Sequence, residues 1–544
     1  MQTARKLPQF LPQVPSRWLS FVYGPAEASF AERLLRWLTG AVIVFGIWLR
    51  CRGLWIGPTL PLWNDEAQWA VMLQTEPLTQ LFIRPIAFMA LTKAILAVFG
   101  AAELSYRFLP WLGGVATALL APAVASRLFS SKAARFLMVV VIALHPSAID
   151  LARDFKPYSV SLAVHLGMLL LALDYLKTRA PAKLYLTLGL GMVGVLFAQD
   201  IIFVYPGLFL ALGLAAYRDR KRTQLFSILA SAAATIAILL GLYFAIWKNL
   251  DREGERNYWG ARYDVFYMAD SGRDSSYLAW LGRQYSEVGA MPGIRREHYE
   301  AAATPDTPLP VIAQVDKWLW FALHVGGVAV LLWRRRLHEC LLLFGPLLVL
   351  TFFNAIGRWP YGAFRTNLFL LAYVTPIAAF AFEPKGISRR LPALLPGLAL
   401  VLLPFFALNK HFHKYKHSFS ATSYYPDAIA RLLTLQLKDY DGEGPELLVL
   451  DTRTCAGFRY YTRYHPMYEG RRSEIDGRFQ VKCGKSTRRL LMKARAHAAR
   501  GERIWGIATG ERQREELDWR MPGYRVISET RLGGEHVLIG VEKT

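Results

Sequence analysis

Long stretches without charge alternate with short polar stretches along most of the chain. Leu225–Trp247 holds 23 residues without a charged side chain, and Leu319–Trp333 and Leu341–Ile356 repeat the pattern. About 20 residues at a rise of 1.5 Å span the hydrocarbon core of a bilayer, so such blocks predict membrane helices rather than the interior of a soluble protein. Twelve apolar segments are present, at approximately 34–50, 84–99, 106–127, 133–150, 157–176, 183–198, 200–217, 223–249, 315–333, 339–356, 366–382 and 391–409.

The loops between these segments carry charges that predict their side of the membrane. Five loops are basic, as cytoplasmic loops usually are; they hold Arg127, Lys132 and Arg135, then Lys177, Arg179 and Lys183, then Arg218, Arg220, Lys221 and Arg222, then Arg334, Arg335 and Arg336, and finally Lys385, Arg389 and Arg390. All five basic loops lie on the cytoplasmic side of the membrane only if one of the early apolar segments does not cross the membrane. Segment 84–99 is the shortest, begins at Arg84-Pro85 and contains Lys93. We therefore predict that it lies along the outer interface or enters the membrane without crossing it, which leaves eleven crossings, a cytoplasmic N-terminus and an external C-terminus.

This topology places several polar stretches together outside the membrane. They are residues 51–105, the turn Ile149–Pro157, the loop 250–314, the turn Gly357–Arg365 and the region 410–544. The chain is therefore predicted to be mainly α, with a cytoplasmic segment at 1–33, a transmembrane module at 34–409 and a soluble external α/β domain at 410–544. In that last domain, the apolar pattern predicts a helix at Arg488–Arg500 and strands at Glu446–Asp451, Arg503–Ala508 and His536–Glu542.

Composition and charge narrow the class of protein further. Of the 544 residues, 53% are hydrophobic and 19% are charged, whereas soluble domains carry roughly 25% charged residues. The net charge of +23 would suit a nucleic-acid-binding protein, but the basic residues lie mostly between apolar segments and no nucleic-acid-binding motif is present. Cys455 and Cys483 lie 28 residues apart in the external region, where they are a candidate disulfide or two free thiols.

The first external segment contains two adjacent carboxylates, Asp65 and Glu66, at the predicted start of an amphipathic helix. Trp63 and Trp69 flank the pair and suit a membrane interface or stacking against a sugar. Acidic residues in a first helical turn also complement the helix dipole without any further role. The pair on its own is therefore compatible with both a site and a helix start.

Two more turns on the predicted outer side are rich in charge. Asp150–Tyr158 interleaves acidic and basic residues at the junction of two membrane helices, where ionisable side chains are costly and usually functional. Gly357–Arg365 carries Arg358 and Arg365 on the side that normally has few cations. A guanidinium binds phosphate through a fork of N–H donors, so this turn predicts a phosphate site or an anchor for lipid headgroups.

Taken in order, these segments resemble the motifs of the GT-C glycosyltransferases of the protein O-mannosyltransferase and aminoarabinose-transferase type. The matching stretches are Asp65-Glu66, Arg84-Pro-Ile-Ala with Phe99-Gly100 and Glu103-Leu-Ser-Tyr-Arg107, Leu151–Tyr158, and Arg358–Arg365. The resemblance covers about residues 30–410. It implies a multi-pass enzyme of the bacterial plasma membrane that moves a monosaccharide from a polyprenyl-phosphate donor to an acceptor on the external, periplasmic face, with inversion at the anomeric carbon.

The resemblance also implies roles for individual residues. Asp65 would be the catalytic base, with Glu66 beside it. Cationic groups would stabilise the departing lipid phosphate, first Arg358 and Arg365, and next Arg153 and Lys156.

The resemblance also implies a further set of side chains that would bind the acceptor, the sugar or a cation. These are Asp154, Tyr158, Trp63 and Arg84. No cofactor is required, although Glu66 and Asp154 are candidate ligands of Mg²⁺ or Mn²⁺. The expected partners are the lipid-linked sugar, membrane lipids and an acceptor glycan, lipid or protein, and not nucleic acid.

Two other functions use the same features. A flippase or transporter of lipid-linked sugars would use the buried charges as a translocation path, although the two halves show no inverted repeat. A polymerase or ligase of surface polysaccharide would share the lipid carrier but move a longer glycan. Replacing Asp65 by Asn separates the first alternative from a transferase, because only the transferase needs a base.

Overall fold

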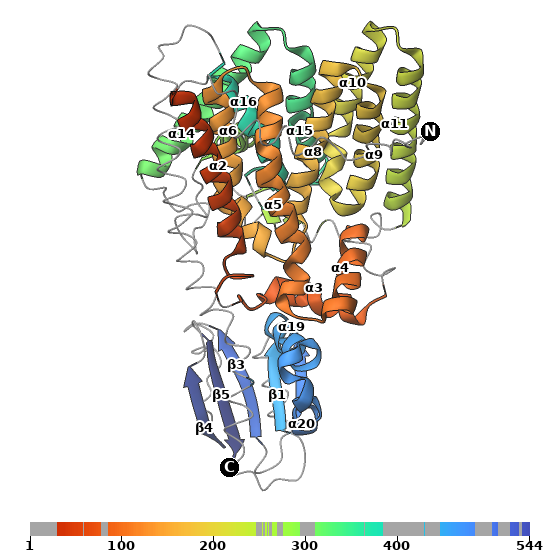
Figure 1. The fold of residues 1–544 in the computed structure, drawn as a ribbon. Helices are drawn as coiled ribbons and strands as arrows, with labels where there is room; N and C mark the ends of the chain where they lie inside the picture. The colour runs from red at the N-terminus through yellow and green to blue at the C-terminus, as the bar shows by residue number, and fades with distance from the viewer. Residues whose placement is uncertain are drawn as a thin grey trace, which may run out of the picture.

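The computed structural model describes residues 30–57, 59–77, 85–245, 253, 256–257, 259–260, 264–268, 276–293, 311–363, 365–383, 429, 446–484, 503–509, 523–531 and 536–544. A bundle of long helices makes up most of it, and a five-stranded sheet lies at one end of the bundle (Figure 1). The predicted fold class, a helical membrane protein with a C-terminal α/β domain, is therefore confirmed.

The bundle follows the apolar segments of the sequence. Its helices are α2 (Phe30–Cys51), α5 (Glu103–Leu128), α6 (Lys132–Leu144), α7 (Pro146–Asp150), α8 (Tyr158–Thr178), α9 (Pro181–Phe197), α10 (Tyr205–Arg218), α11 (Arg222–Ala245), α14 (Val311–Trp333), α15 (Leu337–Ala355) and α16 (Leu371–Phe380). Short 3-10 helices connect some of them: η2 (Leu151–Arg153), η3 (Gln199–Phe203) and η7 (Arg365–Leu370).

Several of these helices are long and apolar enough to cross a membrane. In the described part of the chain six single helices meet this criterion, within α2, α5, α8, α11, α14 and α15, and the bent pair formed by 132–144 and 146–153 makes up to seven. The predicted crossings at 183–198, 200–217 and 366–382 correspond to shorter helices, and segment 391–409 lies outside the described residues. The chain is thus a multi-pass membrane protein, and the count of eleven crossings stays a prediction.

Small residues allow the helices of the bundle to pack closely. A Cβ atom on Gly113 of α5 would lie 2.7 Å from the Cα atom of Val160 in α8, so only glycine fits at this contact. Gly345 of α15 meets the backbone of Gly207 in α10 in the same way, since its Cβ would lie 2.7 Å from the Gly207 Cα. Close backbone approach at small residues is typical of helix pairs in membranes, where van der Waals packing drives association.

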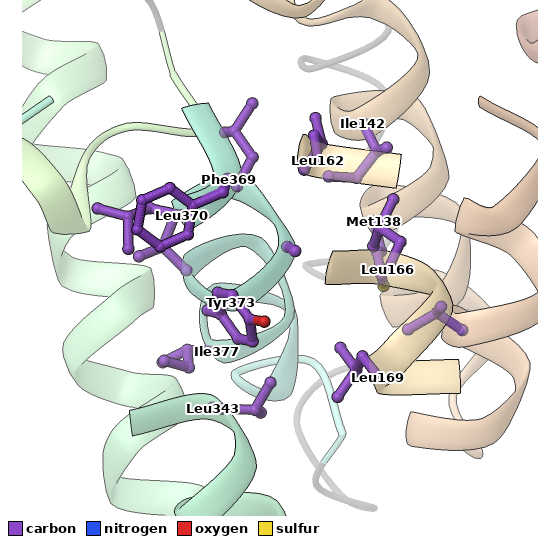
Figure 2. Packing of buried hydrophobic residues seen from close by; sticks show 14 of the residues in the cluster. Met138, Ile142, Leu162, Leu166, Leu169, Leu343, Phe369, Leu370, Tyr373 and Ile377 are labelled. Carbon is purple, nitrogen blue, oxygen red and sulfur yellow. The ribbon is translucent and has the colours of Figure 1, made fainter. Parts of the chain in front are cut away.

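Apolar side chains fill the space between the two sides of the bundle. Figure 2 shows one region of this core, in which residues of α6 and α8 face residues of α15, η7 and α16: Met138, Ile142, Leu162, Leu166 and Leu169 on one side, and Leu343, Phe369, Leu370, Tyr373 and Ile377 on the other. All ten side chains are buried. The core fixes η7 and α16 against α8, and η7 begins at the candidate site residue Arg365 while α8 begins at the candidate site residue Tyr158.

Two short helices lie between the bundle and the sheet. These are α3 (Asn64–Thr75) and α4 (Ile86–Phe99), seen beside each other at the end of the bundle nearest the sheet in Figure 1. A helix of 14 residues such as α4 is about 21 Å long, which is less than the ~30 Å of a hydrocarbon core. This geometry fits the predicted interfacial place of segment 84–99.

The C-terminal sheet has the strand order β2-β1-β3-β5-β4. Its strands are β1 (Glu446–Asp451), β2 (Phe479–Gly484), β3 (Arg503–Thr509), β4 (Tyr524–Arg531) and β5 (His536–Lys543). β1 pairs in parallel with β2 and β3, whereas β5 runs antiparallel to β3 and β4. The three predicted strands are present as β1, β3 and β5, β2 and β4 were not predicted, and the predicted helix 488–500 lies outside the described residues.

The sheet domain shares an apolar core with α3 and α4. Alternation along β1 sends Leu448 and Leu450 into this core, and Val449 into a second cluster on the other face of the sheet. Between β1 and β2 lie α19 (Thr452–Arg459), the π-helical turn η8 (Tyr460–Tyr464), η9 (Pro466–Arg471) and α20 (Arg472–Arg478). Cys455 and Cys483 form a disulfide with Cα atoms 5.9 Å apart, which ties α19 to β2. The helix that packs against α3 is thereby fixed to the sheet.

Candidate functional site

The site begins at the first turn of α3, where two neighbouring acids have different surroundings. Asp65 has a side chain that is 32% exposed, while Glu66 is fully buried. Glu66 accepts hydrogen bonds from Arg107 Nε (2.9 Å) and Nη2 (2.5 Å), from the Trp63 N–H (3.2 Å) and from the Phe155 N–H. All of its acceptor capacity serves the protein, so its carboxylate holds α3 in place.

Arg107 of α5 is the partner that decides this arrangement. Besides Glu66, its guanidinium donates to the carbonyl oxygens of Leu60 and Pro61, the latter at 3.0 Å. The side chain is 2% exposed. A buried cation must be paired with an anion or with several hydrogen-bond acceptors. Arg107 has both, because it binds the Glu66 carboxylate and two carbonyl oxygens of the segment just before Asp65.

The second part of the site is the turn from Asp150 to Tyr158. Arg153 is buried in an ion pair with Asp150 (2.5 Å) and also donates to the Arg52 carbonyl oxygen (3.3 Å). Lys156 points the other way: its Nζ lies 3.0 Å from Asp65 Oδ2 and 3.8 Å from the ring centroid of Trp69. The Lys156 side chain is only 3% exposed, so a cation–π contact and an ion pair replace much of the hydration of its ammonium group.

The third part is the turn between α15 and η7. Two asparagines hold it: Asn354 donates to the carbonyl oxygen of Trp359 (3.0 Å), and Asn367 donates to those of Pro360 (3.0 Å) and Gly362 (2.9 Å). Gly362 has φ +122°, a conformation that favours glycine. With the turn fixed in this way, η7 presents Arg365 toward α3.

Arg365 completes a cluster around Asp65. Its Nη2 lies 3.5 Å from Asp65 Oδ2, and its guanidinium carbon lies 5.5 Å from the Trp63 ring and 5.7 Å from the Trp259 ring. Asp65, Lys156 and Arg365 come from three segments that are up to 300 residues apart in the chain. One partly exposed carboxylate therefore faces two cations amid aromatic rings.

Three other predicted site residues do not join the cluster around Asp65. Glu66, expected beside the base or as a cation ligand, is a buried anchor, because Arg107 and two backbone N–H groups together occupy its carboxylate. Arg153 is likewise held by Asp150. Arg358 is exposed on the turn after α15 and, in the part of the chain that the structure describes, makes no ion pair with Asp65.

Asp154 and Tyr158 flank the cluster. Asp154 is partly exposed, and its charge acts on Glu66 and Arg107. Tyr158 begins α8 and packs partly buried against the bundle core. Arg84 lies outside the described residues.

Metal ligands were also expected as one use of these acids. Among the residues that the structure describes, no group of three or more His, Cys, Asp or Glu side chains is arranged to hold a metal ion. Of the residues that build the site, the role of Arg107 and the contact of Trp69 with Lys156 were not predicted from the sequence. An arginine within an apolar helix is the signal that could have identified Arg107, since such a cation requires a buried partner.

Comparisons with known proteins show which solved structures share the fold of this chain. No protein-family model and no curated protein sequence matches the chain. The structure of ArnT from Cupriavidus metallidurans bound to undecaprenyl phosphate is similar, with a TM-score of 0.51 at 13% sequence identity over 93% of this chain and 97% of that one. The structure of the same protein in the apo state gives a TM-score of 0.50 at 12% identity with the same coverage. The expected GT-C fold is therefore confirmed.

Proposed function

We propose that this protein is an inverting glycosyltransferase that moves a monosaccharide from a polyprenyl-phosphate donor to an acceptor at the outer surface of the membrane. The single observation that carries the proposal is the cluster in which Asp65 Oδ2 lies 3.0 Å from Lys156 Nζ and 3.5 Å from Arg365 Nη2. A base and two cations for a leaving phosphate are the groups that this transfer needs. The similar fold of ArnT, solved with undecaprenyl phosphate, supports the class of donor.

The transfer is a single displacement at the anomeric carbon. The nucleophilic oxygen or nitrogen of the acceptor forms a bond to the anomeric carbon. As it does so, it gives its proton to a carboxylate oxygen of Asp65. The bond between the anomeric carbon and the phosphate oxygen breaks, and its electron pair leaves with the lipid phosphate. Attack from the side opposite the leaving group inverts the configuration of the sugar.

Lys156 and Arg365 act on the charge that develops during this step. The donor is a phosphodiester with one negative charge, and the departing monoester gains a second. Two cations next to that phosphate therefore bind the transition state more strongly than the donor, which is the condition for catalysis. A phosphate that takes over both cations also releases Asp65 from its ion pairs, so that donor binding frees the base.

The aromatic side chains add a surface for the sugar. Trp63 and Trp259 both flank Arg365, and Trp69 lies under Lys156. Indole faces stack against the C–H groups of sugars, and they also reduce the local access of water, which strengthens the ion pairs. This leaves the partly exposed Asp65 as the group that meets the acceptor.

Release of free lipid phosphate tests the proposal directly. The purified protein is incubated with a panel of polyprenyl-phosphate sugars and with isolated envelope membranes as a source of acceptor. We expect one donor to be consumed with stoichiometric release of the lipid phosphate. If every donor binds but none is consumed, and vesicles containing the protein carry the donor across the bilayer, the transporter is the correct function.

Replacing Arg365 by Gln is expected to weaken the binding of free polyprenyl phosphate about 10- to 100-fold. Hydrogen bonds to charged groups contribute about 1.5–3 kcal/mol, and each 1.4 kcal/mol is tenfold in affinity. The measurement is calorimetric titration of the detergent-solubilised protein. Arg358→Gln is the matched control, because Arg358 is an exposed arginine on the same turn; equal losses in both variants, or none in Arg365→Gln, would contradict the assigned phosphate site.

A further inference from the structure

The segment that leads into Asp65 is held from two sides. From the bundle, Arg107 binds the carbonyl oxygens of Leu60 and Pro61 together with the Glu66 carboxylate. From the sheet domain, the hydroxyl oxygen of Tyr461 accepts a hydrogen bond of 3.0 Å from the Leu62 N–H. Leu62 and Tyr461 are both fully buried, so this bond satisfies a backbone donor that water cannot reach.

The Tyr461 hydroxyl also connects this segment to α5. It donates to Glu103 Oε1 at 3.1 Å. Burial, together with the negative charge of Glu103, raises the pKa of Tyr461 well above its usual value, so the phenol stays protonated and can donate. Since Glu103 and Arg107 are four residues apart on α5, they lie on the same face of that helix.

His465 fixes the other oxygen of Glu103. Its Nε2 lies 2.8 Å from Glu103 Oε2, while its Nδ1 accepts the Met467 N–H at 3.1 Å. A nitrogen that accepts cannot also carry a proton, so the proton of the neutral ring is on Nε2 and points at Glu103. The carboxylate that accepts the hydrogen bond of Tyr461 is therefore itself held by the sheet domain.

From these contacts we infer that Tyr461, in the C-terminal sheet domain, is a positioning residue for Asp65. This inference rests on the proposed function, because it assumes that Asp65 is the base. Tyr461 sets the place of Leu62, three residues before Asp65, while Lys156 and Arg365 are carried by the bundle. Loss of the hydroxyl removes one of the two restraints on the segment before α3 and moves the base relative to both cations.

Tyr461→Phe is expected to lower kcat about 10- to 100-fold, because a displacement of about 1 Å in a reacting group can cost 10²-fold. KM for the donor and the affinity for free polyprenyl phosphate are expected to change less than threefold, since the cations that bind the phosphate stay in place. A variant that only loosened the fold would instead lose kcat and phosphate affinity together.

The matched control is Tyr460→Phe. Tyr460 is the neighbouring buried tyrosine, and its hydroxyl donates 3.0 Å to the Ala101 carbonyl oxygen rather than to the segment before α3. This variant also loses one hydrogen bond between the sheet domain and the rest of the protein, but kcat should stay within threefold of the wild type. Equal losses of kcat in both variants, or a wild-type kcat in Tyr461→Phe, would overturn the inference.

Hydrogen exchange separates this inference from the proposed function. Exchange of the amides at 60–66 can be measured without a substrate, and it should be faster in Tyr461→Phe but not in Tyr460→Phe. If the wild type turns over no donor while exchange rises as expected, the proposed function fails and the contact stands. If the wild type is active and exchange at 60–66 is unchanged in Tyr461→Phe, the positioning role fails and the function stands.

Discussion

Replacing Asp65 by Asn is expected to lower kcat about 10²- to 10⁴-fold, the usual contribution of a general base. Asn has almost the same shape, so the first turn of α3 and its anchor at Glu66 should remain intact. Its amide cannot accept the proton of the acceptor, which is the reason for the loss. The measurement is the initial rate of lipid-phosphate release with the donor that the wild type uses.

The same substitution should leave donor binding equal or stronger. Lys156 and Arg365 lie 3.0 and 3.5 Å from Asp65 Oδ2, and without that charge both become more available to a phosphate. A collapse of kcat with an unchanged or lower dissociation constant for the donor is therefore the expected signature. Glu76→Gln removes a carboxylate just after the other end of α3 and serves as the control; retention of more than a tenth of the wild-type rate by Asp65→Asn would exclude Asp65 as the base.

Glu66→Gln should instead act on stability. The change leaves the Arg107 guanidinium buried with its counter-charge removed, and breaking a buried ion pair by removing one partner costs about 3–5 kcal/mol. Glu474→Gln is the matched control, because Glu474 pairs with Arg471 through two hydrogen bonds of 2.8 and 2.9 Å on the exposed surface. Exposed pairs contribute about 0–1 kcal/mol, so this control should hardly change the free energy of unfolding.

The free energy of unfolding can be followed by denaturant titration of the detergent-solubilised protein. A double variant, Glu66→Gln with Arg107→Met, should be less destabilised than the sum of its single variants, since no unpaired charge then remains. Strict additivity of the two single variants would show that the ion pair does not link α3 to α5.

The segments of the site could be predicted from the sequence, but not the place of each side chain in them. Successive residues of a helix point about 100° apart, so one of two adjacent acids faces the core. Which of the two does so depends on Arg107, which lies 41 residues from Glu66 and 42 from Asp65. The turn that carries Arg358 and Arg365 likewise depends on a tertiary contact, since Asn354 donates to the carbonyl oxygen of Val265, 89 residues away in the chain, as well as to Trp359 within the turn.

In the sheet, too, the sequence pattern predicted some strands and missed others. The three predicted strands are the inner ones, β1, β3 and β5, which form continuous apolar runs because both of their neighbours are strands. The two missed strands, β2 and β4, are at the edges of the sheet, where charged side chains interrupt the pattern. The long apolar helices were identified well, since length and hydrophobicity alone decide membrane insertion.

The distance along the chain between Leu62 and Tyr461 bears on the biogenesis of the protein. The two partners are 399 residues apart, and ribosomes add about 5–20 residues per second. Tyr461, which accepts the hydrogen bond of the Leu62 N–H, is therefore made roughly 20–80 s after Leu62. A nascent or truncated chain therefore carries Asp65 without the contact between Leu62 and Tyr461. The place of Asp65 is therefore completed only after Tyr461 has been made and the sheet domain has docked on α3.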